Sequence, residues 1–386
     1  MFRILIYPLN TAIILTLSLF FSLLNFSYFY EQPNDKGILY LLIIVLMYFS
    51  LGVISFGLPK PKVENYSGNE KLYFYLLGTS LMGFVVEFIV CGIPLLIEGG
   101  RDNYSGLPVL HVIFYSMLVC SVAFAALYAN IKGLLGCLAC LFVIAILLLS
   151  RQMIMMASIM TVASLALRYD ISARSVIKVL CYGLLLILVF GILGNLRQQL
   201  SGDYVDDYIY MVGGANANGA LLWEPFYWVW LYIASPIYNL LLNLNDYDSF
   251  GKACNFAISF GSCRGDFISN VLVPNTMVKY MGLENFDIDL VMQHLNVGTG
   301  YAVAARLLGI VGVILLVFAQ LLLFLVGLLI TPGHIRAAFI VYFSTLSFFM
   351  LFDNLFIKGE FFFGFIVIFI TGYLTRPPKN DISPVV

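Results

Sequence analysis

The sequence predicts an all-α, polytopic membrane protein. Of its 386 residues, 61% are hydrophobic and only 11% are charged, whereas soluble domains carry about 25% charged residues. Apolar runs of about 20 residues recur along the whole chain, and each is long enough to cross a bilayer as a helix. A transmembrane β-barrel would instead show short segments of alternating hydrophobicity. The net charge of −1 gives no indication of a nucleic-acid partner.

We predict about 10 membrane spans, within a range of about 10–12. They are the apolar runs 8–30, 37–58, 72–97, 109–130, 132–150, 153–168, 179–196, 301–330, 336–356 and 360–375. The first run is long and has no clear small-residue cleavage site, so we interpret it as a span and not as a signal peptide.

Lysine and arginine are unevenly distributed between the two sides of this layout. The side that holds Arg3 also holds Lys60, Lys62, Lys71, Lys132, Arg168, Arg174, Lys178, Arg336, Arg376 and Lys379. The short loops on the other side hold only Lys36, Arg101, Arg151 and Lys358. The positive-inside rule therefore predicts that the Arg3 side, with both termini, faces the cytoplasm.

The apolar stretch 222–244 does not fit a simple crossing. If it crossed alone, the last three spans would invert and their flanking cations would face outward. We therefore prefer a re-entrant or interfacial segment. The alternative is that residues 255–273 cross back, but Arg264 and Asp266 make that second crossing costly.

This layout divides the chain into three parts. Residues 1–196 form an N-terminal membrane region of about seven spans, residues 197–300 form one large outer loop, and residues 301–386 form a C-terminal region of about three spans. A loop of this length is usually functional, so we expect the site there or beside it.

Five arginines lie at or beyond the predicted outer boundary of the membrane: Arg101, Arg151, Arg197, Arg264 and Arg306. An arginine at this depth is costly unless it is paired or hydrated, and its planar fork suits bidentate binding of phosphate. We predict that Arg151, Arg197 and Arg306 act on an anionic lipid group such as a pyrophosphate, with Arg101 and Arg264 as further substrate contacts. The alternative is that each arginine snorkels to headgroups or pairs with a local acid.

Two histidines and one intramembrane acid are further candidates. His294 precedes the span that contains Arg306, and it is the best-placed general base because imidazole titrates near neutral pH. The alternative is that it only makes hydrogen bonds at the interface. His111, at the outer start of a span, is predicted to be structural or to contact substrate. Glu87 lies within a span, either as a partner of an arginine or as a buried, protonated acid bonded to a neighbouring helix.

An aromatic segment and an acidic segment complete the predicted site. Trp223, Tyr227 and Trp230 belong to a stretch that resembles an interfacial aromatic belt, and such rings also stack on sugars. Asp203 and Asp207, which cluster with Asp206, are candidates for bonding sugar hydroxyls or for pairing with an arginine. The alternative is that they lie in a solvated loop. We find no cluster with the spacing of metal ligands, and we expect neither a metal nor another cofactor.

Three stretches of the chain resemble a known family. They are GNLRQQ around Arg197, WVWLYIASPIYNL at residues 228–240 and GYAVAARLLGIVG at residues 300–312, and the GLPVLHVIFY stretch at residues 106–115 adds to them. In this order they resemble the bacterial oligosaccharide repeat-unit polymerases, the O-antigen polymerase (Wzy) family. The most specific part is W-x-Y-I-x-S-P-x-x-N-L at Trp230–Leu240.

This resemblance implies an inverting glycosyltransferase of GT-C-like fold in the bacterial inner membrane. It would polymerise oligosaccharide repeat units, carried on undecaprenyl pyrophosphate, into O-antigen or capsular-type polysaccharide at the periplasmic face. Donor and acceptor would both be lipid-linked oligosaccharides, and a chain-length regulator is a candidate partner.

Two alternatives stay open at this point. The related O-antigen ligases carry a His-Asn pair ahead of a G-x-x-G on the next span. Here Leu295 separates His294 from Asn296, and Gly309 and Gly312 follow at a wider spacing. In a different class, a lipid-linked oligosaccharide transporter or flippase would show internal symmetry and polar residues near the midplane, which this sequence lacks apart from Glu87.

Arg197 gives the first test. If its fork holds a pyrophosphate, Arg197→Lys keeps the charge but loses the bidentate contact, so polymerisation should fall about a hundredfold, for a loss of about 3 kcal/mol in the transition state. The glycan ladder on a gel measures this. A normal ladder in well-expressed Arg197→Lys would instead indicate an arginine that only snorkels to headgroups.

Overall fold

The structure is a computed structural model. It describes residues 2–56, 63, 69–97, 104, 106–169, 207–250, 266–283, 287–293, 295 and 297–375, together with 177, 181, 183, 184, 188, 191 and 192. The described residues are helical and form no sheet, and an isolated antiparallel bridge joins Ser27 to Ala215. Four of the helices are long and apolar enough to cross a membrane, and shorter apolar helices accompany them. These helices confirm the predicted class, a helical membrane protein. The number of spans and the GT-C-like fold stay predictions.

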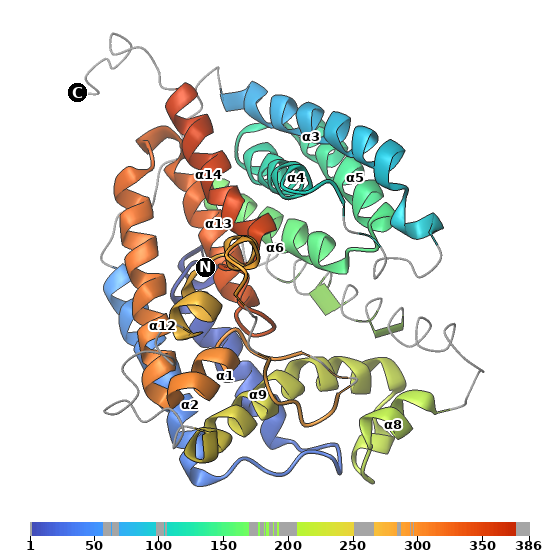
Figure 1. Cartoon of the computed structure of the whole chain (residues 1–386), viewed down its shortest axis with the longest axis vertical. Coiled ribbons are helices and arrows are strands. Elements are labelled where there is room, and N and C mark those ends of the chain that lie inside the picture. Colours follow the sequence, from blue (N-terminus) through green and yellow to red (C-terminus); the bar gives the residue numbers. More distant parts are fainter. Residues whose placement is uncertain are drawn as a thin grey trace.

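The helices form two groups that meet at α13 (Figure 1). One group contains α3 (Asn69–Cys91), α4 (Leu110–Tyr128), α5 (Ile131–Leu147), α6 (Arg151–Arg168) and α14 (Gly359–Leu374). The other contains α1 (Leu9–Leu23), α2 (Asp35–Phe56), α8 (Tyr208–Gly213), α9 (Glu224–Phe250) and α12 (Ala302–Ile330). Helix α13 (Arg336–Phe349) packs against α4, α6 and α14 on one side and against α1 and α12 on the other.

Short helices connect or flank these elements. They are η1 (Phe2–Leu5), η2 (Pro94–Leu96), η4 (Gly219–Leu221), the π-helical turn η5 (Ile268–Leu272), α11 (Asn275–Tyr280) and η6 (Gly333–Ile335).

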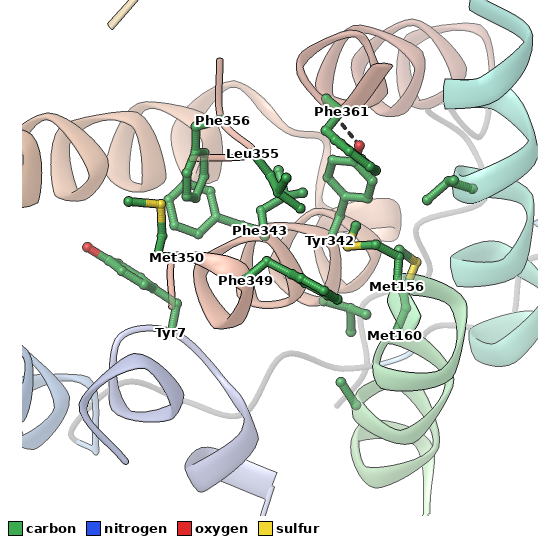
Figure 2. Packing of buried hydrophobic residues seen from close by; sticks show 14 of the residues in the cluster. Tyr7, Met156, Met160, Tyr342, Phe343, Phe349, Met350, Leu355, Phe356 and Phe361 are labelled. Atoms are coloured by element: carbon green, nitrogen blue, oxygen red, sulfur yellow. Dashed lines mark hydrogen bonds between the residues drawn. The ribbon is translucent and has the colours of Figure 1, made fainter. Parts of the chain in front are cut away.

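The core of the bundle lies around α13. Figure 2 shows aromatic side chains of this helix between the start of the chain and the methionines of α6. Phe343 contacts the ring of Tyr7 at a centroid distance of 4.8 Å, and the Tyr342 hydroxyl donates to the carbonyl of Phe361 at 2.7 Å. Met156 and Met160 are fully buried. Because α13 is buried along both faces, it fixes the two groups of helices relative to each other.

Outside the run 179–196, each predicted span corresponds to an observed helix, but three helices end six or seven residues before the predicted end: α3 at Cys91, α13 at Phe349 and α1 at Leu23. The run 8–30 is helical only from Leu9 to Leu23, and 15 residues extend about 22 Å, which is short for a hydrocarbon core of about 30 Å. The helix ends there because Asn25 adopts a left-handed backbone conformation, with φ of 43°. The run 179–196 lies largely outside the described residues.

Helix α9 contains most of the stretch 222–244. It is one continuous helix of 27 residues with Pro236 inside it, and it lies along α12 and α1 (Figure 1). Proline lacks an N–H and disturbs the carbonyls one turn earlier. The hydroxyl of Ser18 on α1 donates to one of these carbonyls, that of Ile233. The position of α9 relative to the bilayer stays a prediction.

Helix α12 changes direction at Gly309. This residue has φ of 60° and ψ of −147°, a conformation that is essentially restricted to glycine. Three residues later, a Cβ on Gly312 would lie 2.2 Å from the carbonyl oxygen of Ala304. The two glycines therefore permit a close turn that sets the direction of the first helical turns, which carry Arg306.

The two ends of the helices are distinguished by their contacts. At the end that we call the His111 end, Ser150 lies 3.4 Å from the Tyr115 hydroxyl, and the Gly300 N–H donates to Met350 at 2.8 Å. At the opposite end, which we call the His334 end, the Tyr128 hydroxyl donates to the carbonyl of His334 at 2.9 Å. Helices α4, α6, α12 and α14 begin at the His111 end, and α13 runs in the opposite direction. The prediction that the His111 end faces outward rests on the distribution of lysine and arginine.

The kink gives a prediction about stability. Gly309→Ala forces a Cβ into a glycine-only conformation, so we expect a loss of about 1–3 kcal/mol and a lower melting temperature in detergent. Gly78→Ala on α3 is the matched control because nothing lies within 4 Å of the added Cβ. Alanine is favoured over glycine inside a helix, so the control should melt at the same temperature as the wild type or higher. Equal melting temperatures for the two variants would contradict the strained kink.

Candidate functional site

A buried carboxyl and an imidazole form a pair at the His111 end. Glu87 on α3 is fully buried, and its Oε1 lies 2.7 Å from Nδ1 of His111 on α4. The Tyr104 hydroxyl donates to the same carboxyl oxygen. Burial, followed by the hydrogen bond and the charge of Glu87, raises the pKa of Tyr104, so the phenol stays neutral and donates. Glu87 is thus bonded to a neighbouring helix, as one of its two interpretations predicts, while Arg101 and Arg197 lie outside the described residues.

His111 is held in place by aromatic and backbone contacts. Its ring makes an edge contact with Phe84, with centroids 6.0 Å apart. Gly106 lies behind it with φ of 63°, and a Cβ at that position would come within 3.0 Å of the imidazole Cγ. The ring is 20% exposed, so Nδ1 faces Glu87 while part of the imidazole reaches the surface. This arrangement orients the histidine and fixes which nitrogen faces the carboxyl.

Tyr115 connects this pair to Arg151 and to α14. Its ring lies 6.0 Å from that of His111 and 5.5 Å from that of Phe361, in the latter case edge to face. Its hydroxyl lies 3.4 Å from Ser150, whose side chain caps the N-terminus of α6. Arg151 is the next residue and is exposed. The structure therefore places Glu87 and His111 in one connected region with the N-terminus of α6, where Arg151 begins the helix.

A polar cavity lies at the same end, between α12 and the turn that precedes α14. Its volume is about 350 Å³, within the usual range for small-molecule sites of about 300–1,000 Å³. The side chains that matter for its chemistry are Asp287, Thr299, Asp353, Asn354 and Lys358, and Phe352 adds an apolar wall. The Lys358 ammonium lies 3.2 Å from the Asp353 carboxylate.

Two glycines bring Thr299 close to this cavity. A Cβ on Gly300 would lie 2.5 Å from the terminal methyl of Met350 and 2.9 Å from the N atom of Asn354. A Cβ on Gly298 would lie 2.2 Å from Ile288. The backbone can approach both neighbours only because these positions lack a side chain.

Arg306 lies one helical turn beyond Val303, which lines the cavity. Its Nη1 is 2.7 Å from the carboxylate of Asp289 and donates to the carbonyl of Asp287 at 3.1 Å. The arginine is 19% exposed and the aspartate 44%. This is the pairing with a local acid that we gave as the alternative. The ion pair with Asp289 holds the Arg306 guanidinium beside the cavity.

Two buried asparagines on α9 fix the segment that carries Asp289. Asn243 donates to the carbonyl of Asp289 at 2.8 Å and accepts from its N–H at 3.0 Å. Asn239 donates to the carbonyl of Val297 at 2.8 Å and accepts from the N–H of Val291 at 2.9 Å. Asn239 belongs to the stretch Trp230–Leu240 on which the resemblance to the polymerases depends. That stretch therefore positions Val291 and Val297, and Asn243, one turn later on α9, positions Asp289.

The predicted aromatic site has a packing role in this structure. Tyr227 and Trp230 are buried and stack on each other, with centroids 5.7 Å apart. Their polar atoms are used internally: the Tyr227 hydroxyl donates to Gly213 and the Trp230 indole to Phe21, both at 2.8 Å. Trp223 is 58% exposed and is the member of the three with an accessible ring.

The other predicted residues are distributed as follows. Asp207 is exposed and precedes the first turn of α8, with φ of 59°. The remaining predictions fall outside the described residues: Arg101, Arg197, Asp203, Arg264 and His294.

Sequence analysis missed the asparagines and the cavity. Asn239 and Asn243 are four residues apart in an apolar helix, which places them on one helical face. This spacing predicts a polar contact along that face of the helix. Thr299 and Asn354 carry no such signal, because they come together only through the packing of α12 against the turn before α14.

Comparison with known proteins gave no match: no protein family, no curated protein and no solved structure is significantly similar to the chain.

The buried pair gives a prediction about stability. His111→Leu leaves the Glu87 carboxyl buried without its imidazole partner, so we expect a loss of about 3 kcal/mol. Replacing both residues, as Glu87→Leu with His111→Leu, removes the buried acid as well. The double variant should therefore melt at a higher temperature than His111→Leu in detergent. A double variant whose destabilisation equals the sum of the two single variants would show that the residues are not coupled.

Proposed function

We propose that this chain is a lipid-linked oligosaccharide polymerase. It transfers a glycan from undecaprenyl pyrophosphate to a lipid-linked repeat unit at the periplasmic face of the bacterial inner membrane. The observation that carries the proposal is the assembly around α9. The helix with the polymerase-like sequence holds the backbone of Asp289, Val291 and Val297 through two buried asparagines, and Asp289 holds Arg306 beside a polar cavity.

The proposed reaction is a single displacement with inversion. A hydroxyl of the acceptor sugar attacks the anomeric carbon of the donor, the new C–O bond forms, and the bond to the pyrophosphate breaks. The electron pair of that bond leaves with undecaprenyl pyrophosphate, and a general base takes the hydroxyl proton. In a GT-C-like arrangement, His294 is the proposed base.

The charge that develops on the pyrophosphate is the main electrostatic demand of this reaction. Arginines held in place before the reaction meet it, and each such contact contributes a few kcal/mol. Arg306 is suited to this role because Asp289 fixes its orientation at the start of α12. Arg151 lies at the N-terminus of α6, where the helix dipole also favours an anion. Arg197 completes the proposed set.

Arg306 provides the test. Arg306→Lys keeps the charge and loses the fork, so we expect about a hundredfold loss of polymerisation in a complemented deletion strain. Protein levels should be near normal, because an ion pair with an exposed aspartate contributes about 0–1 kcal/mol to folding. Arg336→Lys is the matched control at the His334 end, and it should give a normal ladder.

The deletion strain itself separates the alternatives. Loss of a polymerase leaves a single repeat unit attached to the cell surface, whereas loss of a ligase leaves none attached. A full ladder in the deletion strain, or a normal ladder with Arg306→Lys, would contradict the proposal.

A further inference from the structure

In the part of the chain that the structure describes, two residues that line the cavity at the His111 end each have a buried polar atom without a hydrogen-bond partner. Oδ1 of Asn354 and Oγ1 of Thr299 make no hydrogen bond within the described part of the chain. Asn354 is 6% exposed and Thr299 is 4% exposed, and both line the cavity. Buried polar groups are nearly always hydrogen-bonded, so each such atom indicates a missing partner.

A hydrogen bond from the amide nitrogen of Asn354 fixes the orientation of its side-chain amide. Nδ2 of Asn354 donates to the carbonyl oxygen of Val271 at 3.1 Å. A carbonyl can only accept, so the nitrogen must face Val271 and the oxygen is left for the cavity. Asn354 therefore presents an acceptor, and its ligand must donate a hydrogen bond. The Thr299 hydroxyl can accept or donate.

The charged groups that line the cavity disfavour an anion. Asp287 and Asp353 contribute two carboxylates and Lys358 one ammonium, and Lys358 already pairs with Asp353. The pyrophosphate is therefore not the occupant. The ligand that fits is neutral and rich in hydroxyl groups, with an apolar face for the Phe352 side of the cavity.

We infer that this cavity is the sugar-binding subsite, in which hydroxyls of one sugar residue of the lipid-linked oligosaccharide bond to Asn354 and Thr299. The inference rests on the proposed function. The location of the cavity agrees with the proposed function, because Asp287 lines the cavity and its backbone carbonyl accepts a hydrogen bond from Arg306 at 3.1 Å. A sugar in the cavity would thus lie next to the arginine that is proposed to bind the pyrophosphate.

The test measures sugar binding without lipid or pyrophosphate. The probe is the repeat-unit oligosaccharide, released from its lipid by mild acid, and it is titrated calorimetrically into the purified full chain. Thr299→Val replaces the hydroxyl by a methyl group of similar size, and we expect affinity to fall about tenfold for one lost hydrogen bond. Asn354→Leu removes the amide acceptor and should weaken binding at least as much.

Thr276→Val is the matched control. The hydroxyl of Thr276 is also buried without a described partner, but the residue does not line the cavity. This variant should bind the oligosaccharide like the wild type. Neither valine variant removes a described hydrogen bond of the hydroxyl, so both should melt at or above the wild-type temperature, which separates binding from folding.

The outcomes distinguish the two proposals. Loss of affinity in Thr299→Val but not in Thr276→Val supports the sugar subsite, even if the chain makes no polymer and the proposed function fails. Wild-type affinity in both Thr299→Val and Asn354→Leu would overturn the subsite, and so would a wild-type chain that does not bind the oligosaccharide. The proposed polymerase function would then be tested by the glycan ladder alone.

Discussion

The hydrogen bonds from Asn239 and Asn243 to the backbone of Asp289, Val291 and Val297 are the interaction on which the position of Arg306 beside the cavity depends. Each asparagine both donates to and accepts from the backbone of this segment, so the side chains replace the hydrogen bonds that a neighbouring strand would make. Asparagine is costly in an apolar helix unless its amide is satisfied. Nδ2 of Asn243 also donates to the carbonyl of Asn239 within α9, but both amide oxygens accept from the segment that lies against α9. This contact places Asp289 next to Arg306.

The distribution of polar groups follows from the same constraint. Most of the bundle is apolar, and α13 is buried on both faces by rings and methionines. The ionisable groups of the described site lie instead at the His111 end, where Glu87 meets His111 and Asp289 meets Arg306. An ionisable group is tolerated at such a depth when it has a partner, and each of these has one. Asn354 and Thr299 differ because their free atoms face a cavity, and this difference points to a ligand.

The sequence was sufficient for the class of fold and for most helix positions, because a bilayer requires long apolar runs and these are visible without a structure. It was less informative wherever a polar residue finds its partner through space. The partner of Glu87 lies on the next helix, 24 positions along the chain, and nothing in either segment indicates the contact. Tyr227 and Trp230 fit an exposed belt by composition, yet the packing of α9 against α8 and α1 buries them. The kink at Gly309 likewise depends on a backbone angle that spacing does not reveal.

The central claim, which is the proposed function, is that this chain alone joins lipid-linked repeat units. The most direct measurement is polymerisation by the purified protein in a lipid nanodisc. The only substrate supplied would be the repeat unit on undecaprenyl pyrophosphate, without any lipopolysaccharide core. The account predicts a ladder of products that differ by one repeat unit and remain attached to the lipid. If the substrate remains a single repeat unit under these conditions, or is consumed only when a core acceptor is added, the claim is contradicted.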